Sequence, residues 1–337
     1  MGANIPPMEI TTLGVFFPPR LQKEHNLRYL ELVPSMGDVH DVDCNNSDRK
    51  IEWSVLRRLC HIAFSPRLDS FISRIGHSPF ADKIESLIQL EDRGFALFLA
   101  MTTKDPACMT ESSRLPAVYY LACDCPKLRL LAKILQDAGV FSTTGTRPRF
   151  VVFLQWPLIM WLTEMFIDAL SLPYTVIRSS MSMKERVAAA NYFTDPNSDC
   201  VVLLTEYNYV TPDLNLHKAC SRAILLEPPL DMSVVLQAVG RLHCQGQTHP
   251  QKATVLFSQS TISRYIESEN MRKILPLVTA HLRSESQNSS ETDANINGDS
   301  QAMARRADGF AEVELAKPLG QDESHLPYGD PDDLGYY

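Results

Sequence analysis

The residues best suited to chemistry lie in the stretch LQAVGRLHCQGQTHP, residues 236–250, just beyond an apolar strand. Arg241 follows Gly240, and His243 and Cys244 stand behind it, where a second cation would be expected. A lone arginine is also compatible with a structural role in which it caps a neighbouring strand end. No serine lies in a GxSxG motif, so a hydrolase triad has no support. The meaning of the single arginine depends on the elements around it.

The cysteines give no metal framework. Eight are scattered along the chain without CxxC spacing, as is typical of reduced core thiols. Cys123 and Cys125 form a close pair, which two ordinary cysteines before a helix explain better than a metal site does. We therefore predict no metal ligands.

Apolar runs alternate with amphipathic stretches between Cys125 and His281, a pattern typical of a parallel α/β domain. Ser182 with Glu185 forms the capping box of one expected helix, and Pro157 opens another. Repeated alternation of this kind implies a sheet covered by helices on both faces, with function at the carboxyl ends of its strands. The expected strands cover 149–156, 174–180, 199–206, 222–229 and 252–258, and the expected helices 127–139, 157–170, 182–195 and 232–243.

Residues 1–125 form a mostly helical lead-in, with no evident sheet. HNLRYLELVPS, residues 25–35, has the pattern of a strand, and residues 51–66 that of a helix. Residues 82–105 predict one long helix or two short ones. We place the α/β lobe at 126–283 and a tail at 284–337.

The tail is polar and acidic, and we expect it to be disordered because it has too little apolar surface to offset its ordering entropy. It holds twelve acidic and three basic residues, which leaves 28 acidic and 29 basic residues before it, so the folded part is nearly neutral. No apolar run is long enough to span a membrane, and the start lacks the pattern of a signal peptide. Cytoplasm or nucleus is the expected compartment.

Several segments, in order along the chain, resemble a known family. They are similar to the second RecA-like lobe of Swi/Snf-type superfamily-two ATPases, the DNA translocases of chromatin remodelling and repair. The resemblance covers roughly Pro18 to Ser258 and is weaker before residue 126. It is carried by PKLRLLAKIL, RFVVFLQWPLIMWLTEMF, SSMSMKERVAAANYF and LNLHKACSRAILLEPPLDMSVVLQAVGRLHCQGQ.

The resemblance implies roles for the opening stretch. In this family two arginines of the last helix point across a cleft at the γ-phosphate of ATP. Arg241 matches the first of them, whereas Cys244 replaces the second, and a neutral thiol cannot stabilise a phosphoryl transition state. Gln237, Gly240 and Asn215 would lie in the nucleotide cleft.

Two family features are missing. The chain has no GxxxxGK(S/T) phosphate loop, so ATP and Mg²⁺ would bind only if a first RecA-like lobe were supplied in cis or in trans. The family's glycine run before Leu214 is replaced by YNYVTPD, residues 207–213, whose side chains do not permit the same close approach of the backbone to DNA and nucleotide.

The resemblance also implies DNA contacts by Arg178, Lys184, Arg186 and Gln155, although a solvated or locally paired helix face is the alternative for the cations. Two functional hypotheses follow. In one, the chain is the back half of a DNA-translocating, chromatin-remodelling ATPase, truncated or separated from its first lobe. In the other, it is a degenerate, non-catalytic lobe that binds DNA or protein. Both imply a nuclear protein with DNA and chromatin proteins as partners and no membrane.

Overall fold

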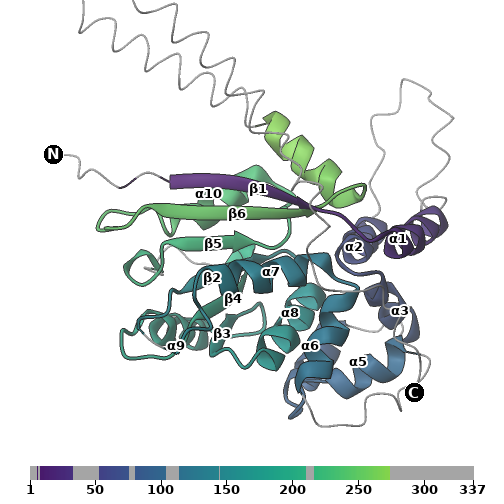
Figure 1. The fold of residues 1–337 in the computed structure, drawn as a ribbon, viewed down its shortest axis with the longest axis horizontal. Coiled ribbons are helices and arrows are strands. Elements are labelled where there is room, and N and C mark those ends of the chain that lie inside the picture. The colour runs from purple at the N-terminus through teal and green to yellow at the C-terminus, as the bar shows by residue number, and fades with distance from the viewer. Residues whose placement is uncertain are drawn as a thin grey trace, which may run out of the picture. The chain divides into compact units, whose positions relative to one another are not determined.

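The computed structural model describes residues 6, 8–32, 53–75, 80–103, 114–143, 145–209 and 216–273 (Figure 1). They lie within one compact unit, Met1–Ile274. Asn215 and the predicted tail, 284–337, lie outside the described residues. No helix of the described part is long and apolar enough to cross a membrane.

A six-stranded, wholly parallel sheet forms the centre of the unit, with the strand order β1-β6-β5-β2-β4-β3. All five strands predicted after residue 126 are present. The sixth, β1, is paired over its whole length with β6, from Met8 opposite Gln251 to Val15 opposite Ser258. The strands are β1 Met8–Val15, β2 Phe150–Leu154, β3 Tyr174–Ile177, β4 Val202–Glu206, β5 Arg222–Leu225 and β6 Gln251–Ser258.

Helices cover both faces of the sheet, as the sequence predicts. Alternate residues of each strand point to opposite faces, so Val152 packs into one core and Val151 and Phe153 into the other. The first core holds α7 (Pro126–Asp137) and α8 (Pro157–Ala169), and the second holds α9 (Met183–Thr194) and α10 (Met232–Gly240). This is the α/β architecture of a RecA-like lobe.

The lead-in helices join the first of these cores. Phe71, Phe98 and Trp161 meet as a buried aromatic cluster, with ring centroids 5.1 to 5.8 Å apart, so α3 and α5 pack against α8. The buried residues Leu32, Val55, Leu59 and Ile62 of α1 and α2 form a third, smaller core. The lead-in helices are α1 Pro19–Leu32, α2 Trp53–Phe64, α3 Pro66–Ile75, α4 Phe80–Ile88, α5 Phe95–Thr102 and α6 Arg114–Cys123, and a further helix covers 262–273.

One expectation for the lead-in is wrong. The segment 25–35 is not a strand, because its described part lies in α1, where Leu21, His25 and Leu32 are buried at helical spacing. The described part of the lead-in is mostly helical, as predicted, and its strand β1, which the sequence did not predict, joins the lobe's own sheet. The boundary at residue 125 stays a prediction.

Candidate nucleic-acid interface

The first turn of α9 holds two of the predicted cations. The Ser182 hydroxyl accepts the backbone N–H of Glu185, and the Glu185 carboxylate accepts that of Ser182 at 2.7 Å. This capping box fixes where the helix begins, which leaves Lys184 exposed on its first turn. Arg186 is half-buried: its Nη2 donates to the Ser179 carbonyl at 2.9 Å.

Arg186 lies over an aromatic turn that follows β4, the short 3₁₀ helix Tyr207–Tyr209, called η3. The guanidinium carbon is 4.6 Å from the centre of the Tyr209 ring. Tyr207 is buried, stacks on Phe153 with ring centroids 5.6 Å apart, and donates its hydroxyl to the Glu227 carbonyl at 2.6 Å. The turn is therefore anchored to the carboxyl ends of two strands.

Helix α10 packs against this turn. Asp231 caps its start by accepting the Ser233 backbone N–H at 3.0 Å. Gln237 is exposed, Gly240 ends the helix and the half-buried Arg241 is its C-cap residue. The Cys244 thiol donates back to the Gly240 carbonyl at 2.9 Å. Cys244, which stands in place of the second arginine, therefore forms a hydrogen bond at the end of α10.

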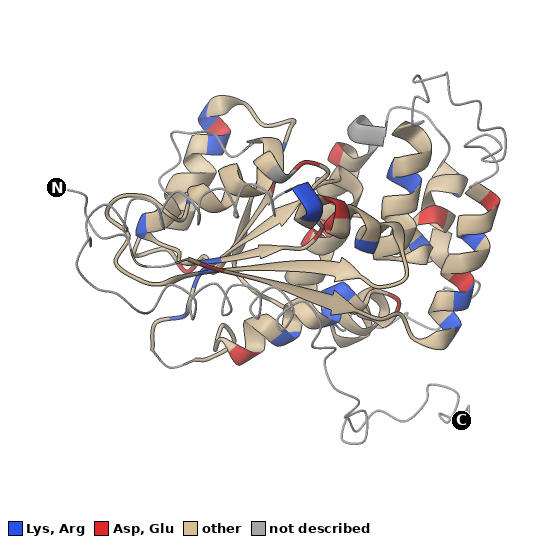
Figure 2. Ribbon diagram, turned by 90° about the horizontal axis from the view of Figure 1, so that it is seen from above, with Lys and Arg blue, Asp and Glu red and all other residues tan. Residues whose placement is uncertain are grey.

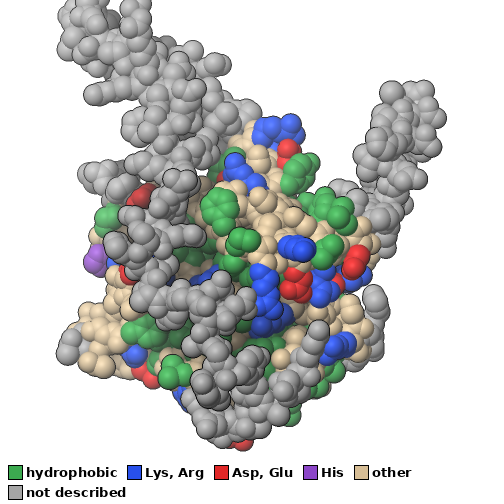
Figure 3. Space-filling view, turned by 45° about the vertical axis from the view of Figure 1, so that its right-hand side comes forward, with side chains coloured by type: hydrophobic (Ala, Val, Ile, Leu, Met, Phe, Trp, Pro, Cys, Tyr) green, Lys and Arg blue, Asp and Glu red, His purple; other side chains and the backbone are tan. Residues whose placement is uncertain are grey.

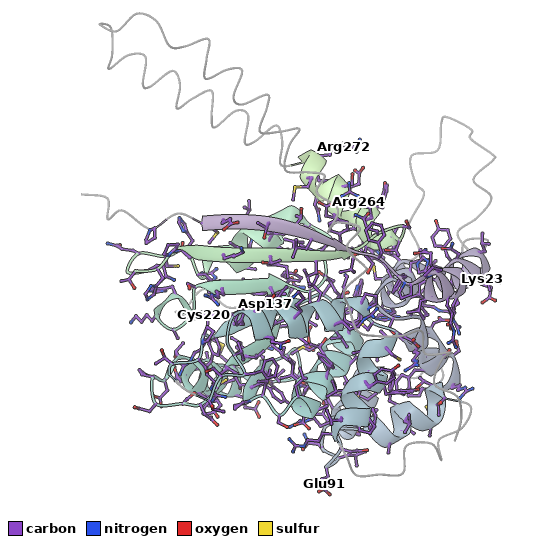
Figure 4. The ribbon with its side chains drawn as sticks, viewed as in Figure 1. Lys23, Glu91, Asp137, Cys220, Arg264 and Arg272 are labelled. Atoms are coloured by element: carbon purple, nitrogen blue, oxygen red, sulfur yellow. The ribbon has the colours of Figure 1, made fainter. Side chains whose placement is uncertain are left out.

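The loop after α10 is held by Gln247, at the amino end of the sheet. Its side-chain amide donates to the carbonyls of Cys220 and Leu242, both at 3.2 Å, and its oxygen accepts two backbone N–H groups of the same loop. Figure 4 labels Cys220 at this end, before β5, and Arg264 beyond β6. Gln247, matched to the family by position, is thus a buried structural residue here.

Two buried side chains of opposite charge, Glu227 and Lys127, lie behind Gln155 and line one small pocket. The Glu227 carboxylate accepts the backbone N–H groups of Gln155 at 3.0 Å and Trp156 at 3.4 Å, and it is fully enclosed with Lys127 of α7. The Lys127 ammonium lies 3.4 Å from the Ser263 hydroxyl and 5.7 Å from the centre of the Phe64 ring. The pair joins the loop after β5 to the lead-in and to helix 262–273.

Burial governs the titration of this cluster. Loss of solvent raises the pKa of Glu227 to about 7, against the opposing charge of Lys127, and lowers the pKa of Lys127 to about 8. Burial likewise lowers the pKa of His61 of α2 to about 3, with Arg57 and Arg58 contributing in the same direction. Neither ring nitrogen of His61 has a hydrogen-bond partner among the described residues.

Arg178 belongs to a charged cluster beside the edge strand β3. It pairs with the buried carboxylate of Glu164 at 2.5 Å, and Arg93 pairs with the same carboxylate at 2.9 Å. Tyr174 donates its hydroxyl to that group at 3.3 Å. The three side chains line a cavity of about 620 Å³ together with Glu164. The charge of Arg178 is neutralised within the protein, and its contact with DNA stays a prediction.

The structure brings some of the predicted residues together and not others. Arg186 and helix α10 meet at the Tyr207–Tyr209 turn, and Gln155 joins them through Glu227. Sequence reasoning missed the Lys127–Glu227 pair. Glu227 carried a signal, because it follows a buried strand and precedes two prolines. Lys127, in the first turn of an ordinary amphipathic helix, carried none.

Charged side chains of both signs lie on the elements around the sheet. In Figure 2, Lys and Arg alternate with Asp and Glu on the helices around the sheet. Figure 3 shows hydrophobic side chains among cations and carboxylates on one face. No group of three or more potential metal-binding side chains occurs in the part of the chain that the structure describes.

The fold and these motifs have counterparts in known proteins. No protein-family model matches the chain. Over 145 residues, 43% of its length, it is 26% identical to the ATP-dependent helicase BRM of Arabidopsis thaliana, and the match spans 6% of that protein. The structure is similar to the C-terminal part of the Fun30 ATPase domain, with a TM-score of 0.53 and 14% identity over 79% of this chain and 90% of that one.

These similarities agree with the motifs quoted from the sequence and with the parallel sheet covered on both faces. The structural likeness shows a fold shared with the C-terminal part of that ATPase domain, a RecA-like α/β lobe, and part of the chain is similar in sequence to that helicase.

Proposed function

We propose that the chain is a nuclear, DNA-binding lobe that does not hydrolyse ATP by itself. The observation that supports this most is the convergence of Arg186, the Tyr207–Tyr209 turn and α10 at the carboxyl end of β4, with Lys184 exposed beside them. Function in parallel α/β folds is concentrated at this end of the sheet. Lys184 would contact the phosphate backbone, Arg186 would do so once its guanidinium is free of the Tyr209 ring, and Gln155 would lie at the same edge.

The chemistry of α10 supports the lack of catalysis. One arginine, Arg241, remains where two would be needed, and Cys244 is a neutral group bonded to its own helix. Loss of an arginine that stabilises a phosphoryl transition state costs on the order of 10³-fold in rate. The sequence also lacks a phosphate loop for the nucleotide.

One observation favours a second candidate, ATP-driven translocation on DNA together with a first RecA-like lobe. Gln237 is exposed on α10, one turn before Gly240 and Arg241, so a second lobe could reach this end of the helix. ATP and Mg²⁺ would then be bound mainly by that lobe. Chromatin proteins are the partners that we infer for either candidate.

The test is DNA binding by matched lysine variants. Lys184→Ala should weaken binding to a fluorescently labelled duplex, measured by anisotropy, and reduce the salt dependence by roughly one phosphate contact. Lys133→Ala is the control, because Lys133 is an exposed lysine on α7, which covers the opposite face of the sheet, and its ion pair with Asp137, one turn later, is a surface contact. Equal effects of the two substitutions, or no binding by the unsubstituted chain, would refute the proposal.

A further inference from the structure

The side chain of Arg186 is held in a conformation that leaves little of it available to a phosphate. Its Nη2 already donates to the Ser179 carbonyl at 2.9 Å. Its Nε is buried, with no hydrogen-bond partner among the described residues. Arginine binds a phosphate most strongly through two parallel N–H groups on one edge of the guanidinium. A phosphate therefore cannot bind to the edge formed by Nε and Nη2. On the edge formed by the two terminal nitrogens, Nη2 already donates a hydrogen bond.

Tyr209 covers the flat face of the same guanidinium. Its ring centre is 4.6 Å from the guanidinium carbon, within the range of a cation–π contact. The turn that carries Tyr209 is itself fixed, because Tyr207 stacks on Phe153 and donates to the Glu227 carbonyl. Burial raises the pKa of the nearby Glu206, and the charges of Arg178 and Arg186 both oppose this rise.

We infer that Tyr209 is an intramolecular cover of Arg186, which restricts the DNA binding of the lobe in its observed conformation. This inference rests on the proposed function, since it concerns the same interface. Glycine in place of Tyr209 would leave this face of the guanidinium open, whereas the tyrosine ring covers it. Displacement of Tyr209 would make Arg186 a phosphate contact in addition to Lys184.

The experiment compares Tyr209→Ala with Tyr209→Phe. The alanine variant removes the ring and should bind a labelled DNA duplex roughly two- to five-fold more tightly at low salt, the affinity equivalent of one exposed cation–π contact. Its affinity for DNA should also fall more steeply as the salt concentration rises, by the amount expected for one additional phosphate contact. The phenylalanine variant keeps the ring over Arg186, so its affinity should equal that of the unsubstituted chain.

A third variant tests whether the tighter DNA binding of Tyr209→Ala comes from Arg186. In Tyr209→Ala/Arg186→Ala the increase should disappear, whereas Arg186→Ala alone should change the affinity less, because the arginine is covered. If Tyr209→Ala does not fold by circular dichroism, Arg186→Lys is used instead. Lysine lacks the planar group that stacks on Tyr209 and should bind DNA at least as tightly as the native arginine.

The outcomes separate this inference from the proposed function. If Arg186→Ala weakens binding equally with and without Tyr209, the cover does not exist, although DNA binding stands. If Tyr209→Ala and Tyr209→Phe have equal affinity, the cover is likewise refuted. If no variant binds DNA, the proposed function fails and the inference fails with it.

Discussion

The carboxylate of Glu227 accepts the backbone N–H of Gln155 at 3.0 Å and so joins the loops that follow β5 and β2. The two loops come from neighbouring strands, yet the residues are far apart in sequence. The contact places Gln155 at the carboxyl end of the sheet, and the carbonyl of Glu227 also receives the hydroxyl of Tyr207. One residue thus fixes two parts of the candidate interface.

The buried Lys127–Glu227 pair should be a coupled unit. Glu227→Ala leaves the Lys127 ammonium without its counter-charge and should lower the free energy of unfolding by roughly 3 to 5 kcal/mol. Lys127→Met should also destabilise, because the buried carboxylate loses its cation. The double variant Lys127→Met/Glu227→Ala should lose less than the sum of the two single changes, measured by urea denaturation as a double-mutant cycle. Additive losses would show that the two groups do not interact.

His61 should make stability depend on pH. In the unfolded chain its pKa is near the ordinary 6.5, whereas burial lowers the pKa to about 3 in the folded protein. Between pH 6.5 and about pH 3, His61 is therefore protonated in the unfolded chain but not in the folded protein. The free energy of unfolding is not reduced by this group above pH 6.5, and it decreases as the pH falls below that value. The loss should be about 2 kcal/mol near pH 5.

His61→Leu tests this dependence because leucine cannot be protonated. The free energy of unfolding should be compared with that of the unsubstituted chain near pH 8 and near pH 5, so that other titrating groups cancel in the difference. The variant should gain in relative stability at the lower pH. A difference that does not change with pH would refute the assignment.

Cys244→Arg should not create an ATPase. The substitution restores the second arginine of the helix, but the chain has no phosphate loop to hold the nucleotide. Phosphate release with and without DNA should stay at the background level for the native chain and the variant. DNA-stimulated turnover in the native chain that Arg241→Ala abolishes would contradict the non-catalytic proposal, and turnover in Cys244→Arg alone would reveal another nucleotide site.

Much of the fold could be predicted because local signals agreed with the global pattern. The capping box of Ser182 and Glu185 located α9, and the uninterrupted apolar run of β2 matched a strand whose residues are all buried. β1 was missed because its evidence is not local: its partner, β6, lies more than 200 residues later. The segment 25–35 was mistaken for a strand because a short apolar run fits both the spacing of a strand and that of a helix.

The candidate site was less predictable than the fold. The family resemblance located α10 and Arg186, but it could not reveal that the Tyr209 ring covers the guanidinium, because this contact depends on the path of the turn after β4. Nor could it reveal that Arg178 pairs with Glu164, fourteen residues earlier on another element. Such partners are set by tertiary packing, which no spacing rule encodes.

The pairing of β1 with β6 imposes an order on synthesis. Residues 8–15 leave the ribosome well before their partner strand, 251–258. At roughly 5 to 20 residues per second, β1 waits for about 10 to 50 seconds for that strand to be made. A nascent strand without its partner can pair with other chains. The lobe's first strand is thus a natural point of contact for chaperones, and its sheet can be completed only after β6 has been synthesised.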